Sequence, residues 1–252
     1  MFGFPVEINL SFLLLLAVVF FAVGRGSISL GLGAVAIVLL AFASVLLHEL
    51  GHALVARRLG VHVSGIELSF LGGAAKMMQM PRSADHEIAI AAAGPAVSLM
   101  LAGAGFGLGA ALHSPLLLTI GTINIVIAAF NLIPALPMDG GRILRALLSR
   151  KMDFVRATDI AVTVSRVTAV AFVVVGLIYG YLQLVILAPF LWMMGTHERM
   201  LARTMANDYA GPGRGGLDVF RRGRGPFDDP DPPARRFEIR QVGGRMVIIP
   251  LD

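Results

Sequence analysis

One short run of the sequence, HELGH at residues 48–52, carries two histidines and a carboxylate at a spacing typical of metal sites. His48 and His52 are four residues apart, so on a helix both imidazoles project from one face. Glu49 is adjacent on the backbone and is turned toward the place where a water next to the metal would lie. This HExxH arrangement predicts a zinc ion bound by the two histidines, with Glu49 able to take a proton from the water.

The apolar surroundings of HELGH argue against a chance match. The run is ASVLLHELGHALVARR, so three ionisable groups lie within five residues of an otherwise apolar helix. Ionisable groups inside a membrane helix are costly and usually functional. Arg57 is nine residues beyond His48, and at a rise of about 1.5 Å per residue this puts the site about 14 Å inside the cytoplasmic boundary. The metal is therefore expected below the membrane surface.

A catalytic zinc also needs a third protein ligand and one open position. A third histidine six residues after His52 is excluded, because Arg58 stands there. Glu67 and Glu87 are possible ligands, although one lies in a polar hairpin and the other at the mouth of a span. We favour Asp139, the only carboxylate between Glu87 and residue 153.

Asp139 follows a segment that cannot continue a helix, AFNLIPALPMDGGR. Pro134 and Pro137 stop the preceding helix, and Gly140–Gly141 let the backbone turn sharply. Irregular backbone at membrane depth is tolerated only where it lines a cavity or is packed in protein. The segment therefore predicts a carboxylate delivered to the site. The alternative is that Asp139 caps a helix that begins near Arg142.

The elements that must position these residues are membrane spans. The 252 residues are 56% hydrophobic and only 15% charged, with a mean hydropathy of +0.79, which is typical of membrane proteins. The net charge is +5, and the basic residues lie beside apolar stretches, where such residues usually fix membrane topology. This distribution does not indicate a nucleic-acid binder. The absence of cysteine excludes disulfides and thiolate metal sites.

We predict an all-α polytopic membrane protein with about six transmembrane helices and a small membrane-associated β-hairpin. About 20 apolar residues cross a bilayer as a helix. The stretches that qualify are about 9–24, 31–56, 86–112, 116–133, 159–179 and 181–197. The first is interpreted as a retained span, because MFGFPVEINL has no basic residue typical of a signal peptide. The hairpin is expected at 63–78, where alternating strands are joined by Gly72–Gly73. These two glycines are either plain turn residues or part of a strand beside the site that pairs with substrate.

The basic residues predict the orientation of these spans. Six spans place both termini and the segments 57–85 and 142–158 on one side of the membrane. That side holds Arg57, Arg58, Lys76, Arg82, Arg142, Arg145, Arg150, Lys151, Arg156, Arg199 and Arg203, whereas the other holds Arg25 and little else. The positive-inside rule makes both termini cytoplasmic.

The composition also divides the chain into two parts. Residues 1–204 are expected to form the membrane core. Residues 205–252 change to Gly, Pro, Arg and Asp and are expected to form a solvated cytoplasmic tail that ends in a small hairpin around Gly243–Gly244.

The combination of HELGH on a membrane helix and NLIPALPMDGGR about ninety residues later resembles the site-2 protease family of intramembrane metalloproteases. Both halves of the family pattern, HExxH and NxxPxxPxDGG, match without a gap, and the likeness covers about residues 5–200. AAAGPAVSL at 91–99 resembles the motif of the family's third span, although Ser98 stands where Asn is frequent. No PDZ insertion separates the motifs, as in the compact branch of the family. The tail after residue 205 is too short and too polar for the CBS pair that several members of that branch carry.

The resemblance implies a role for each matching residue. His48, His52 and Asp139 are implied as the ligands of one zinc ion, and Glu49 as the general base and acid. Asn131 would hold the substrate backbone or the developing oxyanion, unless it is simply a polar helix end. The implied substrates are single-span membrane proteins such as anti-sigma factors or membrane-tethered regulators, which the enzyme would cut within or beside the lipid bilayer.

Other classes of protein remain alternatives on residues alone. A transporter using intramembrane His and Asp would show two related halves, and the sequence has none. An inactive scaffold would lack Glu49 or a ligand. A zinc enzyme of another reaction class stays open. Asn124, seven residues before Asn131 and on the same helix face, is expected to make a hydrogen bond between helices.

Overall fold

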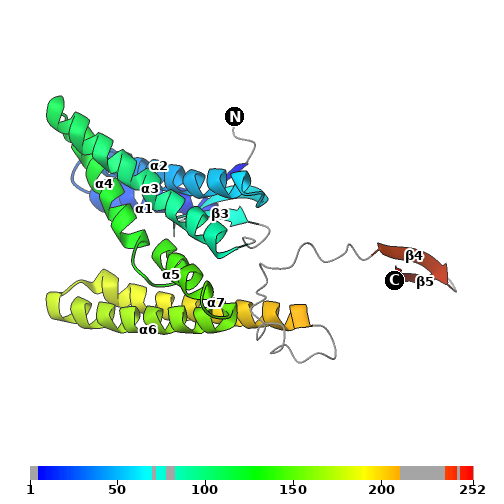
Figure 1. Ribbon diagram of the computed structural model, residues 1–252. Helices are drawn as coiled ribbons and strands as arrows, with labels where there is room; N and C mark the ends of the chain where they lie inside the picture. The colour runs from blue at the N-terminus through cyan, green and yellow to red at the C-terminus, as the bar shows by residue number, and fades with distance from the viewer. Residues whose placement is uncertain (1–4, 70–71, 78–82, 211–235, 243–244, 252) are drawn as a thin grey trace.

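The computed structural model describes residues 5–69, 72–77, 83–210, 236–242 and 245–251 (Figure 1). This part of the chain is mainly helical. Its seven helices are α1 (Leu10–Val23), α2 (Ile28–Arg58), α3 (Ala84–Ala111), α4 (Pro115–Asn131), α5 (Asp139–Ser149), α6 (Phe154–Tyr179) and α7 (Leu182–Ala210). One sheet contains β1 (Val6–Ile8), β2 (Val63–Ser69) and β3 (Gly72–Met77), and a second contains β4 (Arg236–Val242) and β5 (Arg245–Leu251).

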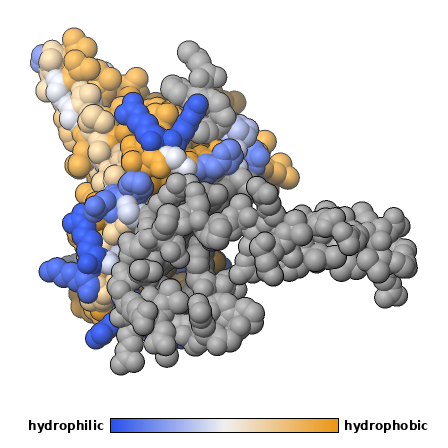
Figure 2. Space-filling view, turned by 45° about the vertical axis from the view of Figure 1, so that its right-hand side comes forward, coloured by the Kyte–Doolittle hydropathy of each residue, from blue (hydrophilic) through white to orange (hydrophobic). Residues whose placement is uncertain are grey.

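Among the described helices, α2, α3 and α6 are long and apolar enough to cross a membrane, and α1 and α4 are shorter apolar helices. Large apolar side chains such as Phe21, Leu30, Val167 and Leu177 are exposed on them, as is expected of surfaces that face lipid. Figure 2 shows one such apolar surface at the upper left, whereas hydrophilic side chains gather toward the middle of the view. The predicted class, a mainly helical membrane protein with a small sheet, is therefore confirmed.

The helices form two groups with α5 between them (Figure 1). Helix α3 packs against α2 and α4 on one side, and α6 and α7 form a hairpin on the other. Gly180 ends α6 with a φ of 73°, a left-handed conformation that glycine adopts without strain. Helix α5 contacts both α3 and α6, so it connects the two groups.

The three-stranded sheet lies against the end of α2 that carries HELGH. Strand β1 runs parallel to β2, and β3 runs antiparallel to it. Val63 and Ile66 of β2 are buried with Ala53 and Ala56 of α2 and with Ile90 of α3. The prediction that Gly72–Gly73 forms the turn of a hairpin is wrong, because these two residues already pair with β2 as the first residues of β3.

The segment between α4 and α5 is irregular, as the prolines predict, but α5 begins earlier than expected. Its first residue is Asp139 and its N-cap is Met138, so the alternative that Asp139 caps a helix starting near Arg142 is wrong. Neither Gly140 nor Gly141 has a positive φ. A Cβ on Gly140 would instead collide with the carbonyl oxygen of Leu132. These glycines therefore allow close packing of the backbone and do not provide a special turn.

Candidate metal centre

Three side chains from two distant parts of the sequence meet between α2 and α5. The Nε2 atoms of His48 and His52 lie 3.2 Å apart. Asp139 places Oδ2 3.1 Å from Nε2 of His48 and 3.2 Å from Nε2 of His52. All three side chains are buried. The four-residue spacing on α2 produces the first contact, whereas the irregular segment before α5 produces the other two.

The second ring nitrogen of each histidine has a partner on α3. Nδ1 of His52 lies 2.7 Å from the carbonyl oxygen of Ile90. A carbonyl can only accept, so this nitrogen carries the proton and Nε2 keeps a free lone pair. Nδ1 of His48 lies 2.9 Å from the hydroxyl of Ser98. Partners of this kind fix the orientation and the tautomer of metal-binding histidines.

The distances and the space at this cluster both fit a zinc ion. Zinc bonds to nitrogen and oxygen are about 2.0–2.1 Å, which puts two ligands of a tetrahedron about 3.3 Å apart. The three observed separations of 3.1–3.2 Å are close to that value. Gly94 of α3 faces the same place, and a Cβ there would lie 2.6 Å from Nε2 of His48 and closer still to Nε2 of His52. Two imidazoles and one carboxylate are a suitable donor set for a catalytic zinc with one open position, and Gly94 places no side chain against them.

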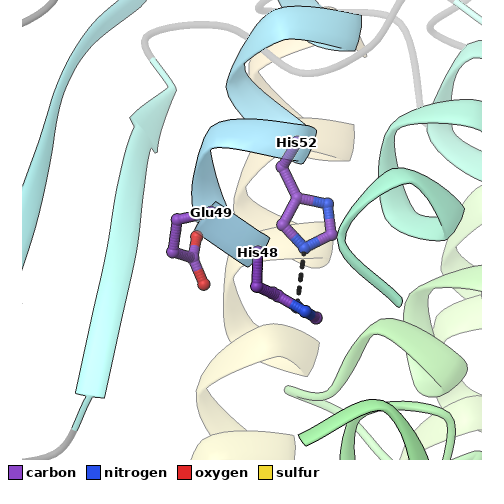
Figure 3. Close-up of side chains that lie close together, drawn as sticks. All are labelled: His48, Glu49 and His52. Carbon is purple, nitrogen blue, oxygen red and sulfur yellow. Dashed lines mark hydrogen bonds between the residues drawn. The ribbon is translucent and has the colours of Figure 1, made fainter. Parts of the chain in front are cut away.

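Glu49 leaves α2 on the side that faces β3. Figure 3 shows the two imidazoles together and the Glu49 side chain to the left of them. His48, Glu49 and His52 nevertheless offer ligand atoms that all lie within 4.8 Å of one another. A Cβ on Gly73 would lie 3.0 Å from Cγ of Glu49, so the backbone of β3 passes directly beside this side chain. The carboxylate is therefore next to both the metal site and a strand.

The other predicted residues lie in different environments. Glu67 accepts a hydrogen bond from Asn9 at 3.2 Å, and Glu87 is bound by Arg145. Asn131 is the last residue of α4, where its side-chain amide donates to the carbonyl of Ile127 at 3.0 Å. Both glutamates are thus bonded to other side chains, whereas Asp139 contacts both histidines.

Asn124 makes the predicted hydrogen bond between helices. Its amide donates to the hydroxyl of Ser44 on α2 at 2.9 Å. This contact links α4 to the helix that carries HELGH, one turn before His48. The expectation of a bond between helices at this position is confirmed.

Two residues that support the site were not assigned a role from the sequence. In the sequence, Ser98 stands out only as a departure from Asn in the third-span motif, and Gly94 is only one residue of that motif. Both face the imidazoles from α3. The available signal was their position in AAAGPAVSL, since residues four apart on a helix share a face.

Comparison with known proteins identifies the family. The pattern of Peptidase family M50 matches residues 35–119 and 110–172. A zinc metalloprotease of Methanocaldococcus jannaschii is 35% identical over 202 residues, which are 78% of this chain and 58% of that protein. The solved structure of a site-2 protease from the same organism superposes with a TM-score of 0.59 and 34% identity, over 79% of this chain and 92% of that one.

The family match includes HELGH and the segment that delivers Asp139. It therefore contains all three of the side chains that converge in the fold. This chain belongs to peptidase family M50, the family of the site-2 proteases.

Proposed function

We propose that this chain is an intramembrane zinc metalloprotease that hydrolyses peptide bonds within or next to transmembrane segments of other membrane proteins. The observation that carries this proposal is that His48 and His52, on the long apolar helix α2, lie 3.2 Å apart and meet Asp139 at 3.1–3.2 Å. Because the chain spans 58% of the length of the curated M. jannaschii relative, its activity is inferred from its own site and not from that protein as a whole.

His48, His52 and Asp139 would hold one zinc ion and leave a fourth position open. A bound zinc supplies Lewis acidity, which polarises the scissile carbonyl and lowers the pKa of water. Glu49 takes the proton of the attacking water and then passes it to the leaving amine. Its place between the histidine pair and β3 suits this transfer, because the base must lie close to the water and to the substrate.

Asn131 is proposed to hold the substrate backbone or the developing oxyanion. Its amide nitrogen has two hydrogens, and one is engaged by the carbonyl of Ile127. The second hydrogen is the one that would bond the substrate. The role therefore requires no loss of the existing contact.

Strand β3 is proposed to hold the substrate in an extended form. A helical substrate hides its carbonyls in i to i−4 bonds, so it must unwind before hydrolysis. In the described sheet β3 is at an edge and pairs only with β2. An added strand would gain backbone hydrogen bonds at that edge, directly beside Glu49. Substrates of this kind are single-span membrane proteins, for example anti-sigma factors or membrane-tethered regulators.

The function is tested with Glu49→Gln. This substitution leaves all three proposed ligands in place, so zinc content should stay at the wild-type level. Cleavage of a single-span reporter in liposomes should fall by about 10²–10⁴-fold, the usual contribution of general acid–base catalysis. Wild-type turnover by the purified variant would remove Glu49 from the mechanism, and a wild-type protein without zinc or cleavage would refute the function.

We further propose six spans with both termini in the cytoplasm, a protease core at residues 1–204 and a cytoplasmic tail at 205–252. Each of the six apolar stretches predicted from the sequence overlaps one helix. A reporter fused after Arg203 should therefore be cytoplasmic, and one inserted at Ser114, the N-cap of α4, should be external. The reverse pattern would place the metal centre near the opposite side of the membrane.

A further inference from the structure

Arg145 forms a buried ion-pair network in the middle of α5. Its Nε donates to Oε1 of Glu87 on α3 at 3.0 Å, and Nη2 bonds the same carboxylate oxygen. Nη1 donates to Oε2 of Glu198 on α7 at 2.8 Å. The guanidinium also lies over the ring of Phe154, 5.1 Å from its centroid. One side chain thus joins α5 to three other helices.

This network connects two helices that support the metal centre, α3 and α5. Asp139 is the first residue of α5, less than two helical turns before Arg145. Glu87 is on α3, about one turn before Ile90, whose carbonyl accepts the hydrogen bond of His52. A continuous set of contacts therefore runs from His52 through α3 and Arg145 to Asp139.

A tie between α3 and α5 does not by itself require a buried charge. Arg150, near the end of α5, already pairs with Asp85 on α3 at 2.5 Å, and both of these side chains are more than half exposed. Arg145 and Glu87 are only 4% and 1% exposed. Taking such charges out of water is costly, and a buried pair is often no more stabilising than apolar residues of the same size. A reason other than stability is needed for the buried pair.

We propose that Arg145 is a positioning residue that holds the carboxylate of Asp139 at the correct distance from the imidazoles of His48 and His52. The planar guanidinium bonds two carboxylates in fixed directions, so it sets the position of α5 relative to α3 more narrowly than apolar contacts do. This inference rests on the ligand set proposed above. It assigns Arg145 no contact with the substrate or the metal.

The test uses the double variant Glu87→Met/Arg145→Met in the full-length, detergent-purified protein. This variant leaves no unpaired charge at the Glu87 position, and Glu198 is 28% exposed, so water can solvate it. Thermal unfolding checks that the variant is folded. The metal centre is then examined by the visible absorption of bound Co²⁺, which reports ligand geometry, and by the rate of zinc release to a chelator. Arg145→Lys is measured in parallel, because it keeps the charge without the two-directional bonding.

We expect the double variant to fold and to show an altered Co²⁺ spectrum. Zinc release should be about 10-fold faster, which is the lower end of the effect that residues supporting a metal ligand have on metal affinity. Arg145→Lys should lie between this variant and wild type. The matched control is Arg150→Gln, which breaks the exposed pair between the same two helices and should leave both readouts unchanged.

Two results would overturn the proposal. One is a wild-type spectrum and release rate in the folded double variant, or in Arg145→Lys if the double variant does not fold. The other is an equal change in Arg150→Gln. A wild-type protein that binds no Co²⁺ or zinc would instead refute the ligand set, so the two failures are distinguishable.

Discussion

The two sides of the metal centre are built in different ways. On the histidine side, one helix carries both proposed ligands, and a neighbouring helix holds each ring through Ser98 and the carbonyl of Ile90. On the aspartate side, the single proposed ligand follows an irregular segment and begins a short helix. The first arrangement depends on the helical repeat of α2. The second depends on contacts between residues far apart in the sequence.

This difference suggests how the centre responds to damage. A histidine that loses its Nδ1 partner still projects from a long, rigid helix at the right spacing. Asp139 has no such local support, because its position follows from the packing of α5 against α3 and α6. Direct loss of a ligand is expected to have the largest effect on zinc affinity, loss of a partner bonded directly to a ring an intermediate one, and loss of a single contact in the segment before α5 the smallest, because the packing of α5 still holds Asp139.

The comparison would break if Asp139 were not a ligand. Asp139→Asn keeps the size of the side chain but removes the negative charge that helps to hold a dication. We expect a folded, membrane-inserted protein that does not cleave. Loss of a residue that only hydrogen-bonds to a metal ligand lowers metal affinity by about 10–100-fold. The loss of zinc affinity in Asp139→Asn should be larger than this.

The control for Asp139→Asn is Glu67→Gln, which should retain full zinc occupancy, because Glu67 lies in β2 and is bonded to Asn9. Metal analysis of the purified variants decides between the two carboxylates. Full zinc in the Asp139 variant with loss of zinc in the Glu67 variant would replace Asp139 by Glu67 as the third proposed ligand.

The contrast between local spacing and long-range packing also explains which features could be predicted from the sequence. The HExxH spacing, the apolar stretches and the period-two pattern of β2 are local, so the helices and the strand follow from them. Asp139 was also found locally, since two prolines before a carboxylate are unusual at membrane depth. Its distance of 3.1 Å from His48, by contrast, is a tertiary result that no local pattern contains.

Other features were missed for the same reason. The pairing of Arg145 with Glu87 joins residues 58 positions apart, and in the sequence Arg145 is only one of the basic residues that orient the spans. Of the two interpretations of Gly72–Gly73, the turn is wrong and the strand is the one observed, because both residues pair with β2. Gly73 also allows the close approach of β3 to Glu49.

The histidine side can be weakened without removing a ligand. Ser98→Ala deletes the hydroxyl that lies 2.9 Å from Nδ1 of His48, and zinc affinity should fall by about 10–100-fold. Ser98→Asn is the matched comparison, because it restores a polar partner and should recover most of the affinity. Chelator competition measures both variants. Equal affinities in wild type and Ser98→Ala would show that the helix alone orients His48.

The equivalent change on the aspartate side is Ser165→Ala. The Ser165 hydroxyl on α6 accepts a hydrogen bond of 2.7 Å from the backbone N–H of Leu136, three residues before Asp139. Both residues are buried, so the alanine variant leaves the N–H without a partner, which costs about 1–3 kcal/mol of stability. Thermal unfolding in detergent should detect this loss.

The expected effect of Ser165→Ala on zinc is the smallest of the series, a few-fold decrease in affinity, because Asp139 is still held through α5. Ser165→Thr keeps the hydroxyl and serves as the control, with affinity near that of wild type. If Ser165→Ala weakened zinc binding more than Ser98→Ala, the aspartate side would depend mainly on the irregular segment, and α5 with its Arg145 network would contribute less than we infer. If stability fell while zinc affinity stayed within a few-fold of wild type, α5 would be the element that positions the third ligand.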